Sequence, residues 1–320
     1  YFFCLTLPLL LIIRIYFYPH PLPPPSSSSS SFHPFTTSEE EVVVCDYTNG
    51  SWVPDKRGPL YNGTTCGTIK KGQNCIVHGR PDMGYLYWRW KPTHCDLPRF
   101  DPFVFLHLLR HKHLAFVGDS MARNQLESLL CMLATVSLPK LVYNYGGENK
   151  FRRWHFGSHN VTVSVYWSPF LVKGVEKSKT RPDHNELYLD SVDERWAGDL
   201  ESIDVVLMSV GHWFLHPAVY YERAGSVVLG CHYCPGLNYT EIGFYDVLRK
   251  AVRTGLDAVV ERGRSGGAGR GINVMLTTFS PAHFEGEWDK FGACNKVEPY
   301  REWEKMLEGM DAEMREIEVS

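Results

Sequence analysis

A serine at residue 120 lies where a predicted strand meets a predicted helix, a position that suits a catalytic nucleophile. The apolar run 114–117 predicts the strand, Gly118 permits a sharp turn, and leucines at helical spacing predict a helix over 121–133. Free backbone N–H groups and the positive dipole end of that helix would stabilise an oxyanion beside the serine. Serine and aspartate are also preferred helix caps, so the alternative is that Asp119 or Ser120 only caps the helix.

A serine nucleophile needs a base that takes its proton, and usually a carboxylate that orients the base. Spacing does not choose among the seven histidines that follow the serine, which are His155, His159, His184, His212, His216, His232 and His283. His212 follows a predicted strand, and loops at the carboxyl ends of parallel strands carry the chemistry of open α/β sheets. We therefore weigh substrate or oxyanion binding by His212 against simple packing of its loop. The other candidates for contacting substrate or oxyanion are Gly118, Asp119, Asn124 and Gly211, and for Asn124 a solvated helix position is the alternative.

The elements that position these residues alternate between strand and helix from Leu114 onward. Further strands are predicted over 140–145, 161–167, 204–210 and 272–277; the second alternates like a half-exposed strand, and the last two are of buried type. Further helices are predicted over about 191–200, 240–262 and 300–319. This alternation predicts an α/β sandwich with a parallel sheet, in which the glycine-rich stretch 262–271 is a surface loop and not a phosphate site.

Length, composition and charge bound the class of protein. The 320 residues are 44% hydrophobic and 22% charged, which is ordinary for a globular protein with one principal domain. A net charge of −3 gives no electrostatic case for binding nucleic acid. Residues 1–18 are almost wholly apolar and predict a transmembrane anchor in preference to a signal peptide, because a Pro- and Ser-rich stem over 19–41 follows without a small-residue cleavage site. Residues 42–100 predict a cysteine-rich, loop-rich segment that wraps a domain over 101–320.

Sequons and cysteines both indicate that the chain beyond the apolar run enters the secretory lumen. Sequons predict N-glycosylation at Asn49, Asn62, Asn160 and Asn238. Disulfides are the expected state of Cys45, Cys66, Cys75, Cys95, Cys131, Cys231, Cys234 and Cys294. The spacing of Cys231 and Cys234 also fits a zinc or redox pair, but no second matching pair completes a four-ligand zinc site, so we expect no metal.

Several blocks carry a family resemblance. CDYTNGSWV (45–53), YLYWRWKPTHCDLPRFDP (85–102), FVGDSMARNQ (116–125), SVGHWF (209–214) and TFSPAHFEGEWDKFGAC (278–294) resemble, in this order, blocks of the plant trichome birefringence-like family of Golgi polysaccharide O-acetyltransferases. The stretch GCHYCPGLNYTEIGFYDVLRKA (230–251) is most similar to the branch that acetylates xyloglucan.

The resemblance implies a three-layer α/β fold of the GDSL/SGNH-esterase type, with Ser120 as the nucleophile. That serine would accept an acetyl group and pass it to a hydroxyl of a cell-wall polysaccharide, for which this branch implies xyloglucan. The resemblance also implies a single-pass type II protein of the Golgi membrane with its catalytic domain in the lumen. It implies no bound cofactor, and an acetyl donor for which acetyl-CoA is one candidate.

The sequence departs from the family pattern in two places. The family's Asp-x-x-His block, which supplies the orienting carboxylate and the base, does not follow residue 294, and Thr277 stands where the family has an arginine. The chain starts at Tyr1 and stops inside a predicted helix, so we expect it to be clipped at both ends and inactive as written, because triad enzymes lose most of their rate without the base. The rival interpretations are a GDSL-type carbohydrate acetylesterase and a non-catalytic protein that binds wall polymers.

Overall fold

The computed structural model describes residues 45–69, 80, 82–147, 150–177, 183–234, 236–265, 271–280 and 296–320. The predicted anchor and stem over 1–41, together with Cys75, His283 and Cys294, lie outside these residues. Within the described part of the chain, no helix has the length and apolar character needed to cross a membrane.

A six-stranded sheet forms the centre of the molecule. Its strands, in spatial order, are β12 (Asn273–Leu276), β9 (Val205–Ser209), β3 (His113–Gly118), β6 (Val161–Trp167), β5 (Phe151–Phe156) and β4 (Lys140–Tyr145). The first four strands are mutually parallel, as the alternation of strands and helices predicts. Strands β5 and β4 extend the sheet in antiparallel register, because the short connections around them cannot make the crossover that parallel strands need.

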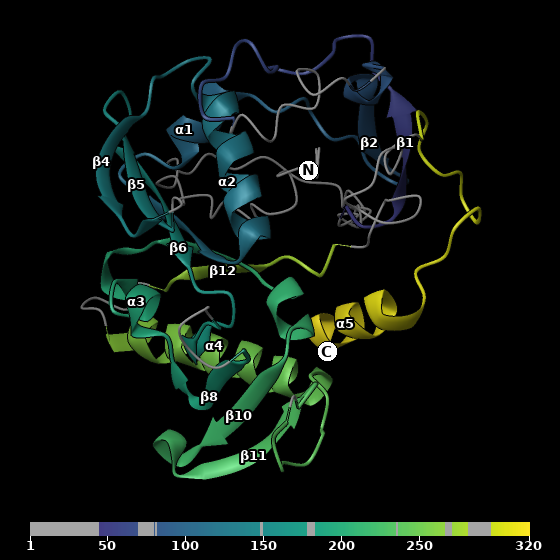
Figure 1. The fold of residues 1–320 in the computed structure, drawn as a ribbon. Helices are drawn as coiled ribbons and strands as arrows, with labels where there is room; N and C mark the ends of the chain where they lie inside the picture. The colour runs from purple at the N-terminus through teal and green to yellow at the C-terminus, as the bar shows by residue number, and fades with distance from the viewer. Residues whose placement is uncertain are drawn as a thin grey trace, which may run out of the picture.

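Helices cover both faces of this sheet and complete three layers (Figure 1). One face carries α1 (Pro102–Leu108) and α2 (Ser120–Leu133) over a core that includes Phe116 and Leu126. The other face carries α3 (Glu194–Ala197), α4 (Tyr245–Ser265) and α5 (Gly309–Val319) over a core that includes Trp196 and Leu248. The fold is therefore the predicted α/β sandwich.

A second, four-stranded sheet lies beyond α4 and was not predicted as a separate sheet (Figure 1). Its strands, in spatial order, are β11 (Val227–His232), β10 (Ala218–Glu222), β8 (Asn185–Val192) and β7 (Val172–Val175). Short 3-10 helices occur at η2 (Gly84–Tyr87), η4 (Leu200–Ser202), η5 (His212–Leu215) and η6 (Arg223–Gly225).

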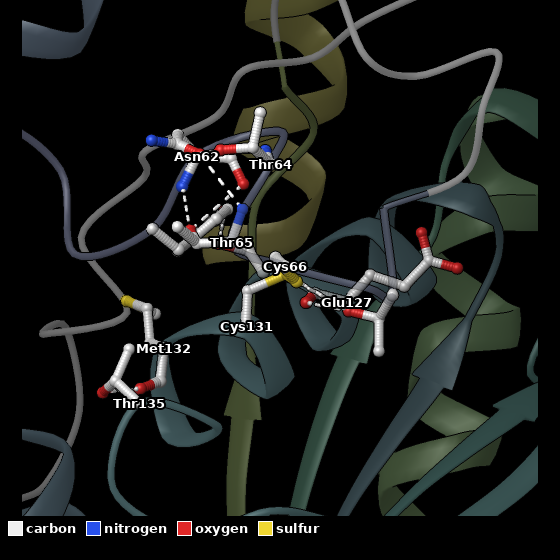
Figure 2. The surroundings of a disulfide bond; sticks show 11 residues. Asn62, Thr64, Thr65, Cys66, Glu127, Cys131, Met132 and Thr135 are labelled. Carbon is white, nitrogen blue, oxygen red and sulfur yellow. Dashed lines mark hydrogen bonds between the residues drawn. A yellow bond between two sulfur atoms is a disulfide. The ribbon is translucent and has the colours of Figure 1, made fainter.

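The cysteine-rich N-terminal segment contains one small antiparallel sheet, β1 (Gly50–Pro54) paired with β2 (Trp88–Pro92). Its ends are joined by the disulfide between Cys45 and Cys95. A second disulfide joins Cys66 to Cys131 in the last turns of α2 (Figure 2). The hydroxyl oxygen of Thr68 lies 3.1 Å from the first sulfur and 3.2 Å from the second. The segment is thus covalently attached to the sandwich.

Several predicted elements differ from the observed ones in burial or length. Strand β6 is buried on both faces, because α2 packs on one side and the α3 side of the core on the other, whereas β12 is only half-buried. The helix predicted over 191–200 is reduced to α3 and η4, because β8 continues to Val192. Helix α4 begins at Tyr245, and the last helix begins only at Gly309, whose φ of +58° breaks the helical path. Trp303, in the part of the predicted helix that does not form, is exposed.

Candidate functional site

In the turn between β3 and α2, the residue that caps the helix is not the serine. Asp119 is the N-cap of α2, and its carboxylate accepts a hydrogen bond from the backbone N–H of Met121 at 2.8 Å. Ser120 is the first residue of the helix and is half-buried. The aspartate therefore caps the helix, and the serine side chain is not required for capping.

The end of β3 is fastened to the end of β9. The backbone N–H of Asp119 donates to the carbonyl oxygen of Ser209 at 3.1 Å. Gly118 has a φ of +151°, and a Cβ there would overlap the same carbonyl oxygen, so only glycine allows this close approach. The structure thereby brings the predicted serine turn and the predicted Gly211–His212 loop to the same edge of the sheet.

Phe279 supports the Gly211–His212 loop. Gly211 has a φ of +148°, and a Cβ there would overlap the Phe279 ring, which packs against the His212 ring with 4.6 Å between the ring centroids. Burial lowers the pKa of His212, with a smaller opposing effect of Asp311. The His212 ring is thus packed in its loop, and its predicted contact with oxyanion or substrate stays a prediction.

Asp119 is a fully buried carboxyl group at the base of the serine turn. Burial raises its pKa to about 7, although the backbone N–H groups of Met121 and His212 and the charge of Arg123 act in the opposite direction. The cost of burying the charged form is therefore larger than the combined effect of these hydrogen bonds and of Arg123. The backbone N–H of His212 is therefore close enough to the carboxyl group of Asp119 to lower its pKa.

Asn124, the remaining predicted contact residue, is half-buried one turn along α2 from the serine. Its neighbour Arg123 was not predicted from the sequence to be a site residue. Its guanidinium lies over the Trp167 ring at 5.4 Å from the centroid, and Trp167 contacts Trp213 edge to face at 5.4 Å. Trp167 ends β6 next to the serine turn, since the N–H of the following Ser168 donates to the carbonyl oxygen of Gly118, and Trp213 lies in η5 after β9. In the sequence they could not be told from core aromatics.

A groove of about 270 Å³ opens beside this face of α2. It is lined by α2, by β5 and β6, and by residues 67–69 of the N-terminal segment, with Arg123 and Arg152 as its two cationic side chains. The N-terminal segment therefore lines the same groove as Arg123, which is three residues along α2 from Ser120.

The structure places Cys231, Cys234 and Glu241 close enough for their ligand atoms to lie within 4.8 Å of one another. The two cysteines form a disulfide, so neither sulfur is present as the thiolate that zinc requires. All four sequon asparagines, Asn49, Asn62, Asn160 and Asn238, are exposed.

A serine at the start of the helix that follows strand β3, with the Gly211 loop following the neighbouring strand β9, is an arrangement typical of serine acyl hydrolases and acyltransferases. Comparison with known proteins agrees with this class. Residues 97–320 match the PC-Esterase family, a GDSL/SGNH-like acyl-esterase family found in Pmr5 and Cas1p, and residues 43–96 match the PMR5 N-terminal domain.

Relatives of high sequence identity identify the branch of the family to which the chain belongs. Xyloglucan O-acetyltransferases 1 and 2 of Populus trichocarpa are 68% and 67% identical to this chain, over 97% of its length and 72% and 73% of theirs. Xyloglucan O-acetyltransferase 1 of Arabidopsis thaliana is 67% identical over 86% of this chain and 64% of its own. The chain belongs to the PC-Esterase family, within the trichome birefringence-like proteins and their xyloglucan O-acetyltransferase branch.

Proposed function

We propose that this protein transfers an acetyl group through Ser120 to a hydroxyl of xyloglucan. The observation that carries the proposal is that Asp119 caps α2, so the hydroxyl of Ser120 at the helix N-terminus is not needed for capping and can act as the nucleophile. The names of the relatives from poplar and Arabidopsis indicate which group is transferred, an acetyl group, and which polymer accepts it, xyloglucan.

The reaction has two steps at the serine oxygen. In the first, the oxygen bonds to the carbonyl carbon of the donor's acetyl group, the leaving group departs with the electrons of its bond, and a general base takes the serine proton. In the second, the oxygen of a sugar hydroxyl bonds to the same carbon while its proton passes to the general base, and the bond to Ser120 breaks as the serine oxygen takes a proton back from that base and regenerates the hydroxyl. Backbone N–H groups at the start of α2 stabilise the oxyanion of both tetrahedral intermediates.

Aromatic side chains beside the serine suit a sugar acceptor. Trp213 is half-buried at the carboxyl end of the sheet, in contact with Trp167 and close to Phe170 at 6.0 Å between ring centroids. Large aromatic faces provide apolar area with a fixed orientation, which is what the apolar face of a sugar ring needs. Excluding water at this edge would favour transfer over hydrolysis.

The proposal includes the compartment and the donor. A lumenal catalytic domain on a Golgi anchor is supported by exposed sequons and by three disulfides that form in an oxidising compartment. We take acetyl-CoA as the first donor to test, with the protein holding no cofactor of its own.

The test incubates the purified full-length protein with isotopically labelled acetyl-CoA and an unacetylated xyloglucan oligosaccharide, followed by mass spectrometry of both the sugar and the Ser120 peptide. Label on the peptide and then on the sugar is the expected result. The rival is an esterase, which the description of the family as acyl-esterases favours. Release of acetate from acetylated oligosaccharide without any transfer would establish that rival, and binding of the sugar without either reaction would establish a non-catalytic protein.

A further inference from the structure

Three residues of α5 face the loop that lies beside the serine turn. Asp311, Met314 and Glu318 are spaced i, i+3 and i+7, which places them on one face of the helix. Asp311 acts electrostatically on His212, and the Met314 methyl group is 3.2 Å from where a Cβ of Gly211 would be. This face of the helix therefore forms the back wall of the Gly211–His212 loop.

Glu318 makes a direct hydrogen bond to the segment that supports the loop. Its Oε2 accepts from the backbone N–H of Phe279 at 2.5 Å, across 39 residues of sequence. Phe279 is 6% exposed and its ring fills the space that a side chain on Gly211 would occupy, besides packing on His212. A contact at the backbone of Phe279 thus fixes the position of the ring under the loop.

The burial of Glu318 is not explained by packing alone. The side chain is 8% exposed, and its Oε1 has no hydrogen-bond partner among the residues that the structure describes. Burial is the main cause that raises the pKa of this carboxyl to about 7; the hydrogen bond from the Phe279 N–H acts in the opposite direction, and the nearby charge of Asp119 adds to the rise. A buried, half-satisfied carboxyl costs free energy that an apolar side chain would not. The neighbouring Glu316 is exposed and makes no such contact through its side chain in the described structure.

We propose that Glu318 is a positioning residue for the reaction at Ser120: it holds Phe279, and Phe279 holds Gly211 and His212 in place beside the serine. This inference rests on the proposed function. It differs from an anchoring role for α5, which would affect the amount of folded protein and leave the turnover of each folded molecule unchanged.

The test compares Glu318→Ala and Glu318→Gln, with Glu316→Ala as the matched control on the exposed side of the same helix. Each variant of the full gene product is assayed for acetyl transfer to xyloglucan oligosaccharide, with rates normalised to the folded fraction from thermal unfolding. Because misplaced active-site groups lower the rate of chemistry, Glu318→Ala should reduce kcat about 10- to 100-fold with little change in the acceptor KM. Glu318→Gln should restore most of kcat, since its amide oxygen can accept from the same N–H, and the control should match the wild type.

A second variant keeps the test decisive where Glu318→Ala folds poorly. Phe279→Leu removes the ring and keeps the backbone N–H, so it should lower kcat similarly, and the double variant should lose much less than the product of the two single effects. Independent, multiplicative effects would overturn the proposal, as would an unchanged kcat per folded Glu318→Ala molecule. Failure of the wild type to transfer acetyl groups would instead overturn the proposed function.

Discussion

The backbone N–H of Asp119 donates a hydrogen bond to the carbonyl oxygen of Ser209 at 3.1 Å, which fastens the end of β3 to the end of β9. The bond joins the turn that carries Ser120 to the strand that leads into Gly211, two residues beyond Ser209. The relative position of the serine turn and the glycine loop is therefore set by backbone hydrogen bonds of the sheet. Substitutions at this edge of the sheet should therefore change the rate of acetyl transfer and the free energy of unfolding to different extents.

Ser120→Ala should abolish acetyl transfer without unfolding the protein. Loss of a covalent nucleophile costs about three to six orders of magnitude in rate. The melting temperature should stay within about 2 °C of the wild type, since Asp119 provides the cap of α2 and the serine hydroxyl is not needed for it. Mass spectrometry for acetylated peptide and thermal unfolding together check both halves. Residual acetylation of the variant at another residue would show that the nucleophile lies elsewhere.

The effect of Asp119→Asn on the free energy of unfolding should become more favourable as the pH rises from 4 to 8. The pKa of Asp119 is raised to about 7 in the folded protein, so folding favours its protonated form, and its contribution to stability is lost as the pH rises from about 4 through 7. Asparagine caps helices as well as aspartate does and has no charge to bury. The difference in unfolding free energy, variant minus wild type, should therefore grow by about 2–4 kcal/mol between pH 4 and pH 8.

Urea unfolding curves at several pH values measure that difference. A constant difference across the range would show that the Asp119 carboxylate is solvated or paired in solution.

Gly211→Ala should impair both folding and transfer. The methyl group would overlap the Phe279 ring, and alanine would adopt a φ of +148°, so we expect a loss of about 2–4 kcal/mol in stability and about a tenfold or greater loss in kcat. Gly243→Ala is the control, because its φ is +71° but nothing lies within 4 Å of the added carbon. That control should cost only about 1–2 kcal/mol and leave kcat unchanged. Equal effects of the two substitutions would exclude a packing role of Phe279.

Replacing Cys66 and Cys131 together by serine should destabilise the protein by about 2–4 kcal/mol, because the disulfide closes a long loop in the unfolded chain. The matched control replaces Cys231 and Cys234, which are separated by only three residues and should matter less. Guanidinium unfolding without reductant, followed by intrinsic fluorescence, measures both. Similar losses for the two pairs would mean that loop closure does not determine the effect.

Local patterns in the sequence predict the serine turn and the parallel centre of the sheet, because both depend on short stretches such as 114–125. The choice of cap could not be predicted, since Asp119 and Ser120 are equally good caps and only the backbone geometry separates them. The predicted start of the last helix was wrong because Gly309 takes a positive φ, which the apolar spacing does not reveal. The bond between Phe279 and Glu318 joins residues far apart in the chain, and no periodicity signals it.

Helix α2 has the serine at its first residue and a disulfide to the N-terminal segment near its last turn (Figure 2). The segments that match the two family descriptions, 43–96 and 97–320, are consequently not interchangeable modules. A chimaera that takes residues 43–96 from one paralogue and the remainder from another would have to retain Cys66 and Cys131, together with the fit of residues 67–69 against the groove beside α2. Recombination at that boundary would exchange one side of this groove along with the segment, so the two halves are expected to have diverged as one unit.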